Sequence, residues 1–367
     1  MLALRDQDDT VLLSHRALLA HTGPANRVAA ALVYRLMRQA ADTLSPGAPI
    51  NRYGMHVRSA FSGPGVLDGL DYITRGRTDG RLVIDAAIAP DDAPESPLGR
   101  FAFHVLLRNR GCALVLRPEF FPAEFAALVA AQLDGSADAQ ATAAFRRAQS
   151  DLAAAILDAP KGVVFEVRAI GDLPLRPTVQ ADEAGTTITP DEAPPPVVRV
   201  ADGGEAVTVS FADMLAYHGR ENIGGVALGF QTLAFVLPRL SPDRPLERRA
   251  VRVLSAFPGT GFLDAVEVAL RTTTDERMTV ATDLEEPRGT PAARGLFVFR
   301  FQTPDRHLTV TLKDGLVPPA FRHYAALNRA GQLTAVERTL FQGVKEDLAR
   351  LLLSQPPEAL FDILDEG

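Results

Sequence analysis

The sequence predicts an α+β protein made of two tandem copies of one domain, each with the order α-β-α-β-β-β, a mainly antiparallel sheet and C-terminal helices. Shifting the chain by 196 positions aligns residues 14–165 with 210–361 without a gap, and 41 of these 152 pairs are identical. SAFSGPGVLD recurs as SAFPGTGFLD, and GRFAF recurs as GLFVF. Because this period is far longer than a solenoid repeat, it indicates duplication of a whole domain.

Each copy opens with an amphipathic pattern that predicts a helix, at 25–42 and 221–238, with Asn26 and Asn222 as candidate N-caps. A strand is expected next, at 53–61 and 250–257. The remaining expected elements of each copy are a glycine turn, a short helix ending near residue 75 or 271, strands at 81–88, 100–107 and 112–117 (277–283, 296–302 and 308–313 in copy 2), and two helices at 122–133 and 139–157.

Three segments follow from this pattern: a first domain over 1–165, a linker over 166–209 and a second domain over 210–367. The linker contains PLRPTVQADEAGTTITPDEAPPPVV, and its proline and acid content suits an extended connection. At roughly 3.3 Å per extended residue it is long enough for the copies to pair as an internal pseudo-dimer.

Composition restricts the function classes. The 367-residue chain has a formal charge of −7 and a pI near 5.6, which argues against nucleic acid as a partner. Its only cysteine, Cys112, excludes disulfides and cysteine-based metal sites within one chain, so no metal is expected. No basic, apolar leader and no 18-residue apolar run is evident, so we expect a cytoplasmic protein without a membrane partner.

His218 is the first candidate functional residue. It lies in AYHGRENIGGVALGF, beside glycines at the expected start of a helix, where exposed amides favour an anion. The alternative is that Gly219, Gly224 and Gly225 serve only a helix cap and close packing. Copy 1 has Thr22 at the position of His218, so histidine chemistry would be one-sided.

The glycine turns of the SAF-x-G-x-G motifs are the second candidate. They precede a helix N-terminus, whose amides could bind a carboxylate or phosphate, although no GK[ST] follows as in a P-loop. Asp68 and Asp264 are expected in the first turn of that helix, where they would repel an anion unless they point away. A purely structural turn is the alternative. The glycines concerned are Gly63, Gly65, Gly259 and Gly261.

The third candidate is a pair of potentially cationic strand positions. His56 and His104 in copy 1 are replaced by Arg252 and Arg300 in copy 2, so both copies keep this pair. If the strand faces converge, they could bind an anionic ligand; otherwise they are solvated or salt-bridged. Arginine does not ligate metals, so a metal site is disfavoured.

These motifs resemble a known family. HGRENIGGVALGF is similar to the HGHxCPGxALG(Y/F) opening of the formylmethanofuran dehydrogenase E-subunit family, and SAFPGTGFLDAVEVALRTTTD to its C-x-x-DAIQ-x-x-TGCT stretch. The resemblance covers about 210–321 and, through the repeat, 14–125. The family's first cysteine falls at or beside Ile223 and Gly224, and a second is replaced by Gly261 and Gly65. The resemblance implies α-β-α-β-β-β units that pair, with a site at their interface, and carries over only His218 and Asp264 as functional positions.

Three hypotheses follow. The resemblance, with the cationic positions, predicts an accessory protein of one-carbon metabolism that binds, makes or loads an anionic carrier of methanofuran or methanopterin type. The second is a non-catalytic interaction or scaffold subunit that has lost the family's metal site and binds a protein partner of a one-carbon complex. The third is a metal-independent enzyme in which His218 is the general base and Asp264 orients it. Whether the chain is an enzyme stays open at this point.

Overall fold

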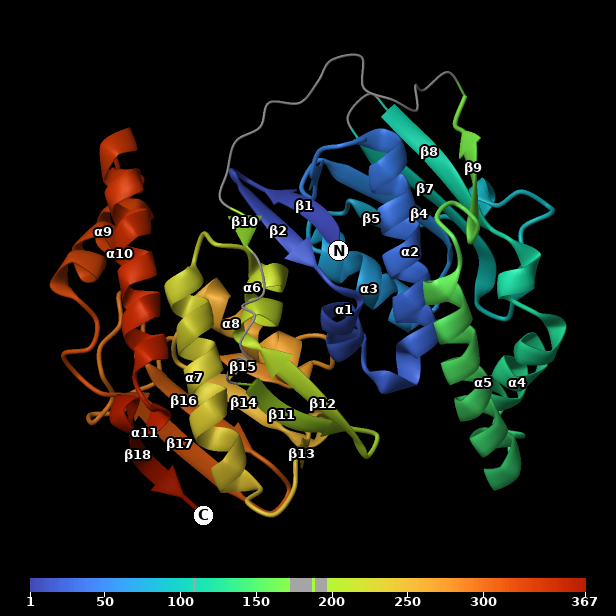
Figure 1. Ribbon diagram of the computed structural model, residues 1–367. Coiled ribbons are helices and arrows are strands. Elements are labelled where there is room, and N and C mark those ends of the chain that lie inside the picture. The colour runs from blue at the N-terminus through green and yellow to red at the C-terminus, as the bar shows by residue number, and fades with distance from the viewer. Residues whose placement is uncertain (108–109, 172–186, 189–196) are drawn as a thin grey trace. The chain divides into compact units, whose positions relative to one another are not determined.

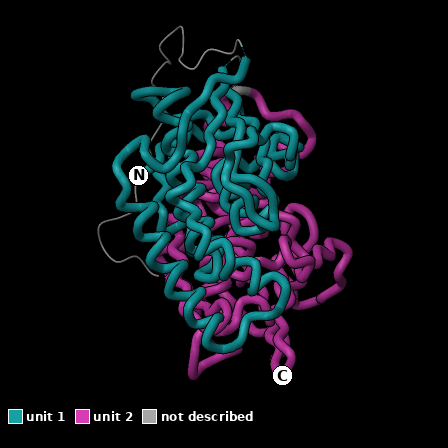
Figure 2. Tube along the Cα trace, turned by 90° about the vertical axis from the view of Figure 1, so that its right-hand side faces the viewer, with its two compact units in different colours: residues 1–190 teal, residues 191–367 magenta. Residues whose placement is uncertain are grey.

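The computed structural model describes residues 1–107, 110–171, 187–188 and 197–367, and it has an α+β fold (Figure 1). The chain divides into two compact units, Met1–Pro190 and Asp191–Gly367 (Figure 2). Each unit combines a small sheet, a larger sheet and helices, and all four sheets contain both parallel and antiparallel strand pairs. The pseudo-dimeric arrangement of the two copies stays a prediction.

Unit 1 begins with a β-hairpin and continues through alternating helices and strands. Its elements are β1 (Leu2–Asp6), β2 (Asp9–Leu13), α1 (His15–Thr22), α2 (Arg27–Leu44), β3 (Ile50–Asn51), β4 (Met55–Phe61), α3 (Pro64–Thr74), β5 (Leu82–Ile84), β6 (Glu95–Ser96), β7 (Gly99–Leu107), β8 (Arg110–Leu116), α4 (Ala123–Leu133), α5 (Ala139–Asp158), β9 (Phe165–Ala169) and β10 (Thr187–Ile188). Its larger sheet has the strand order β5-β4-β7-β8-β9.

Unit 2 repeats this series 196 residues later. Its elements are β11 (Val197–Asp202), β12 (Glu205–Ser210), α6 (Phe211–His218), α7 (Ile223–Leu240), β13 (Leu246–Glu247), β14 (Arg252–Ser255), α8 (Thr260–Leu270), β15 (Met278–Val280), β16 (Val298–Gln302), β17 (His307–Leu312), α9 (Pro319–Arg329), α10 (Ala335–Ser354), α11 (Pro357–Leu360) and β18 (Phe361–Glu366). The bounds of α6 to α10 equal those of α1 to α5 plus 196 at every end. Its larger sheet has the matching order β15-β14-β16-β17-β18.

Each copy contains more strands than the sequence pattern predicted. A hairpin, β1–β2 or β11–β12, precedes the first helix, and a closing strand, β9 or β18, pairs with β8 or β17 at the edge of the larger sheet. The segment expected to be a linker, 166–209, therefore contains most of β9 and most of the β11–β12 hairpin, while 172–186 and 189–196 lie outside the described residues. In β1 and β2 the apolar residues are consecutive, as in LALRD and DTVLL, so their hydropathy does not alternate as the strand signal requires.

Two details of the helix starts also differ from expectation. Neither Asn26 nor Asn222 makes a side-chain cap. Asn26 Nδ2 instead donates to the carbonyl of Thr22, and Asn222 Nδ2 donates to Thr260 Oγ1. The carboxylates at 68 and 264 are each the fifth residue of their helix rather than first-turn residues, because α3 and α8 begin directly after Gly63 and Gly259.

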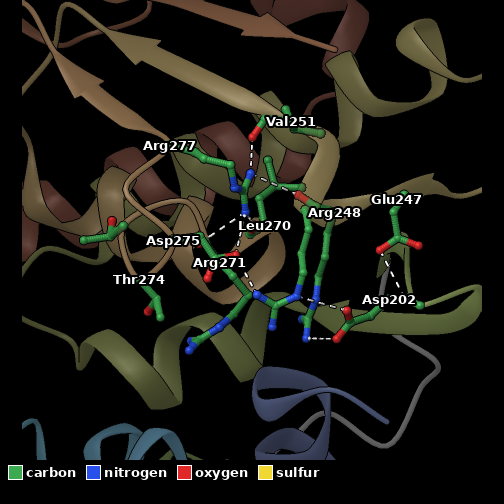
Figure 3. A network of polar contacts seen from close by, with 12 residues as sticks. Asp202, Glu247, Arg248, Val251, Leu270, Arg271, Thr274, Asp275 and Arg277 are labelled. Carbon is green, nitrogen blue, oxygen red and sulfur yellow. Dashed lines mark hydrogen bonds and ion pairs between the residues drawn. The ribbon is translucent and has the colours of Figure 1, made fainter. Parts of the chain in front are cut away.

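A buried arginine cluster connects the hairpin of each unit to the end of a helix. In unit 2, Arg248 is fully buried and its Nη2 donates to Asp202 Oδ2 at 2.6 Å (Figure 3). Arg277 donates to the carbonyls of Leu270 and Arg271 at the C-terminal end of α8, where no intrahelical partner is left for them. It also donates to the carbonyls of Arg248 and Val251.

Unit 1 has the same cluster at the equivalent positions. Arg52 is fully buried, pairs with Asp6 at 2.7 Å and donates to the carbonyls of Tyr72 and Ile73 near the end of α3. Arg81 donates to the carbonyls of Thr74 and Arg75, as Arg277 does in unit 2. The hairpin, the main sheet and the glycine-turn helix of each copy are thus held together by one desolvated cluster.

Replacing Asp202 with Ala is expected to destabilise unit 2 by about 3–5 kcal/mol, because it leaves Arg248 buried without its carboxylate partner. Asp347→Ala is the control: its ion pair with Arg350 is 66% and 75% exposed, so its loss should cost under about 0.5 kcal/mol. Urea unfolding followed by circular dichroism measures both. Equal midpoints for the two variants would contradict a stabilising role for the buried pair.

Candidate functional site

His218 is placed by a short, well-capped helix. Ser210 begins α6 with a capping box in which its hydroxyl accepts from the amide of Asp213, and the Asp213 carboxylate accepts from the amide of Ser210. The helix ends where Gly219 adopts a φ of 89°, and the amide of Gly219 donates to the carbonyl of Leu215. His218 is thus the last helical residue, and α6 packs against α8, which carries Asp264.

The structure brings His218 and Asp264 into direct contact. The imidazole Nδ1 lies 2.7 Å from Asp264 Oδ2, and the two side chains are 8% and 18% exposed. Because a carboxylate only accepts hydrogen bonds, the proton of the neutral imidazole lies on Nδ1, and Nε2 keeps its lone pair. Within the described residues, the buried Nε2 has no hydrogen-bond partner.

A histidine held in this way is equipped for proton transfer. The carboxylate fixes the tautomer and the ring orientation, and it stabilises the imidazolium that forms when Nε2 takes up a proton. A buried nitrogen without a partner also carries a desolvation cost, which a ligand that donates a hydrogen bond would offset. The pair therefore has the geometry of a general base with its orienting carboxylate.

The positions of this pair are occupied differently in unit 1. Thr22, the counterpart of His218, uses its hydroxyl to donate to the carbonyl of Leu18. Asp68, the counterpart of Asp264, forms an ion pair with Arg77 at 3.1 Å. The carboxylate thus recurs in both units, but in unit 1 a threonine takes the position of the histidine.

The glycines at the helix starts are sites of close packing. A Cβ added to Gly261 would lie 2.5 Å from the carbonyl oxygen of Asn222. At Gly63 and Gly259, an added Cβ would lie 2.2 Å from the rings of Phe61 and Phe257. Gly224 and Gly225 are also closely packed. An added Cβ would lie 3.2 Å from Lys345 O at Gly224 and 3.2 Å from Gly261 Cα at Gly225. These contacts account for the glycines by packing alone.

The four cationic positions lie on strands of the larger sheets. His104 is paired in register with Arg58, and His56 lies two residues away along β4 on the same face. In unit 2, Arg252 and Arg300 belong to the neighbouring strands β14 and β16. Gly63 and Gly65 line a cavity in unit 1 whose wall includes neither histidine. This cavity therefore does not bring the unit 1 glycines and histidines together.

The charges on these faces differ from the sequence-based expectation. Burial, and secondly the positive charge of Arg58, lower the pKa of His104, while Asp85 acts in the opposite direction. His104 is thus neutral at pH 7. Arg58, which the sequence analysis did not single out, is a permanent cation on this face and lies 3.5 Å from Asp85. In unit 2, Arg300 has a buried Nε without a hydrogen-bond partner among the described residues.

Comparison with known proteins gives no further assignment: no protein-family model matches the chain, and no curated protein matches it significantly. Among the described residues, no group of three or more His, Cys, Asp or Glu side chains is arranged to hold a metal ion. Helix α7 is long and apolar enough to cross a membrane, but it is mostly buried in the protein, as core helices are. Family membership and localisation stay predictions.

The glycine analysis predicts unequal effects of matched substitutions. Gly261→Ala should destabilise unit 2, because the added methyl would meet the backbone at Asn222 and Val226, which cannot move without shifting α7. Gly65→Ala should be milder, because the nearest atoms that the methyl would meet belong to the side chain of Asn26, which can shift at the cost of its hydrogen bond to Thr22 without moving the backbone. Thermal unfolding of both variants tests this. Equal losses would mean that the two turns are not held as described.

The His104 environment predicts a titration midpoint below the ordinary value near 6.5. Its neutral form is favoured in the folded state, so its contribution to stability is fully present above the unfolded-state pKa and is lost as pH falls below it. Arg58→Gln should raise the midpoint by removing one of the two causes. Histidine NMR titration measures it, and a midpoint at or above 6.5 in the unaltered protein would contradict this description.

Proposed function

We propose that unit 2 carries an acid–base site in which His218 exchanges a proton with a small molecule while Asp264 orients the ring. The observation that carries the proposal is the 2.7 Å contact between Nδ1 and Asp264 combined with a buried Nε2 that has no partner among the described residues. A purely structural histidine would normally use both ring nitrogens when buried. The reaction assigned to this site is proton transfer to or from the ligand at Nε2.

In the proposed step, Nε2 accepts a proton from a donor group of the bound molecule, and the resulting imidazolium is stabilised by the Asp264 carboxylate. The proton returns when the product leaves. Arg220 lies two residues from His218 and is tied to Glu346 on α10 at 2.9 Å, with the carbonyl of Arg220 also accepting from Gln342. These contacts fix the turn between α6 and α7 and so hold the end of α6.

The substrate class rests on the resemblance to the formylmethanofuran dehydrogenase E-subunit family, and it stays a proposal. It points to one-carbon metabolism and to an anionic carrier of methanofuran or methanopterin type. Support from the structure is limited to Arg252 and Arg300, which lie on adjacent strands and include an arginine Nε that has no partner among the described residues. A scaffold role, with a protein partner in place of a carrier, is the alternative.

His218→Gln and Asp264→Asn are expected to lower turnover by about 10²–10⁴-fold, the usual contribution of a positioned acid–base group. Full-length protein is incubated with a metabolite extract of a related host, and consumed and formed compounds are followed by mass spectrometry. Asp68→Asn, the same change at the unit 1 carboxylate, is the matched control and should leave turnover unchanged. Turnover that survives in His218→Gln would refute the acid–base role.

A chain that changes no metabolite but co-purifies with a stoichiometric protein partner would favour the scaffold role instead. The carrier proposal has its own readout, calorimetric titration with polyglutamylated and phosphorylated carriers. Arg252→Gln combined with Arg300→Gln should weaken such binding at least tenfold, and more strongly at low salt, because the contacts are charge-based. No heat with any carrier would remove this part of the proposal.

A further inference from the structure

A cavity of about 280 Å³ lies in unit 1, at the N-terminal ends of α2 and α3. Residues of strand β7 and of the helices α4 and α5 contribute to its wall. Five phenylalanines line it, namely Phe61, Phe101, Phe121, Phe125 and Phe145. Their rings form a continuous series with centroids 4.3 to 5.8 Å apart. The pocket is partly open to solvent, so a ligand can reach these rings from outside.

Among the described residues that line the cavity, none carries a charge. The polar side chains among the described lining residues are Asn26, Ser96, Gln132 and Gln149, and the rest are apolar residues or glycines. An ion entering the cavity would lose its hydration without gaining a counter-charge. The cavity therefore favours a neutral ligand, in contrast to the anionic ligand expected from the glycine turn at Gly63 and Gly65.

Two amide groups in the wall have a fixed orientation. Gln149 Nε2 donates to the carbonyl of Ala25 at 3.0 Å, and Asn26 Nδ2 donates to the carbonyl of Thr22 at 2.7 Å. Because a carbonyl can only accept, the amide nitrogens must face these groups and the amide oxygens must face the other way. Within the described residues neither oxygen has a partner. A Cβ added to Gly65 would lie 2.4 Å from Asn26 Oδ1, which places this oxygen against the start of α3.

We propose that this cavity binds a neutral aromatic molecule of one or two rings that carries a hydroxyl or N–H donor. The rings would stack on the phenylalanines, and the donor would bond an oxygen of Asn26 or Gln149. The volume suits such a ligand, since a cavity of roughly 150 Å³ accommodates benzene. This inference concerns unit 1 and goes beyond the acid–base site proposed for unit 2.

In unit 2, the positions equivalent to the cavity wall include a charged residue. Lys345 takes the position of Gln149, and its Nζ donates to the carbonyl of Glu221 at 2.7 Å, as Gln149 does to Ala25. Gly224 takes the position of Val28, and α10 approaches so closely there that an added Cβ would lie 3.2 Å from the carbonyl of Lys345. Lysine thus preserves the tie between the two helices while introducing a cation.

The test uses full-length protein and 2-naphthol, a neutral bicyclic donor, followed by calorimetry and fluorescence. We expect saturable binding to one site and a rise in the Tm of the ligand-bound protein. 2-Methoxynaphthalene, which lacks the donor, should bind several-fold more weakly, and naphthalene-2-sulfonate at least tenfold more weakly. No saturable binding of 2-naphthol at millimolar concentration, or tighter binding of the sulfonate, would overturn the proposal.

Cavity-filling substitutions test whether 2-naphthol binds in this cavity. Ala29→Leu fills the cavity from α2 and should weaken 2-naphthol binding at least tenfold, whereas Ala154→Leu, on the exposed face of α5, should leave it unchanged. Val129→Phe fills the cavity from α4 and serves as a second variant if Ala29→Leu does not fold. Gln149→Lys, which copies unit 2, should weaken 2-naphthol and strengthen the sulfonate. Binding that is unchanged in the filling variants would show that the ligand lies elsewhere and would refute the proposal.

Discussion

The pairing of a fully buried arginine with an aspartate from the opening hairpin is the interaction on which each unit depends. Asp6–Arg52 and Asp202–Arg248 connect a hairpin to the segment before the first long strand of the larger sheet. Removing a guanidinium from water is costly unless its donors are satisfied, so each arginine admits few arrangements of its neighbours. In unit 1, the carbonyls of Tyr72 and Ile73 accept two of the hydrogen bonds that Arg52 donates, which fixes the end of α3 against the hairpin.

This constraint reaches the candidate site through α8. Arg277 holds the C-terminal end of α8 at Leu270, and close glycine packing holds its start, where an added Cβ at Gly261 would collide with Asn222. Because α8 is fixed at both ends, Asp264 has a defined position relative to the rest of unit 2. The histidine comes from α6, whose own start is fixed by the Ser210 capping box. Preorganisation of the His218–Asp264 pair is thus a consequence of how both helices are held.

The sequence predicted the helices well and the additional strands poorly, for reasons that particular residues show. The long helices have many apolar positions at helical spacing, and the repeat presents each pattern twice. The hairpin β1–β2 has short strands with charged residues next to its turn, and it is secured by the Asp6–Arg52 pair, a contact between residues 46 positions apart. Composition and periodicity do not report such a contact, although Asp6 and Arg52 both recur in copy 2 as Asp202 and Arg248.

The candidate site is partly visible in the sequence. His218 and Asp264 stand out as residue types, but their contact required the structure because α6 and α8 are separated by the whole of α7. The cationic positions were identified by residue type, but type alone did not show that burial keeps His104 neutral or that Arg58 adds a permanent charge beside it. The aromatic cavity was not predicted, although four of its phenylalanines recur in copy 2. Repeated aromatics are typical of an ordinary core, so the pattern alone does not indicate a cavity.

Divergence of the two copies follows one physical pattern: the groups that join the elements of the fold are retained, while some buried polar side chains beside them change. The arginine cluster, the glycines at the helix starts and the αL residues Arg75 and Arg271 are common to both units. Two positions differ between the copies: Thr22 corresponds to His218, and Gln149 corresponds to Lys345. Each of these residues still forms a hydrogen bond, and Gln149 and Lys345 bond equivalent backbone carbonyls. A threonine that bonds its own helix leaves Asp68 to pair with Arg77, whereas a histidine at the same place engages the carboxylate and turns its second nitrogen away from it. Because the frame is fixed by buried pairs elsewhere, such a change alters the chemistry of a unit without requiring any change in its fold.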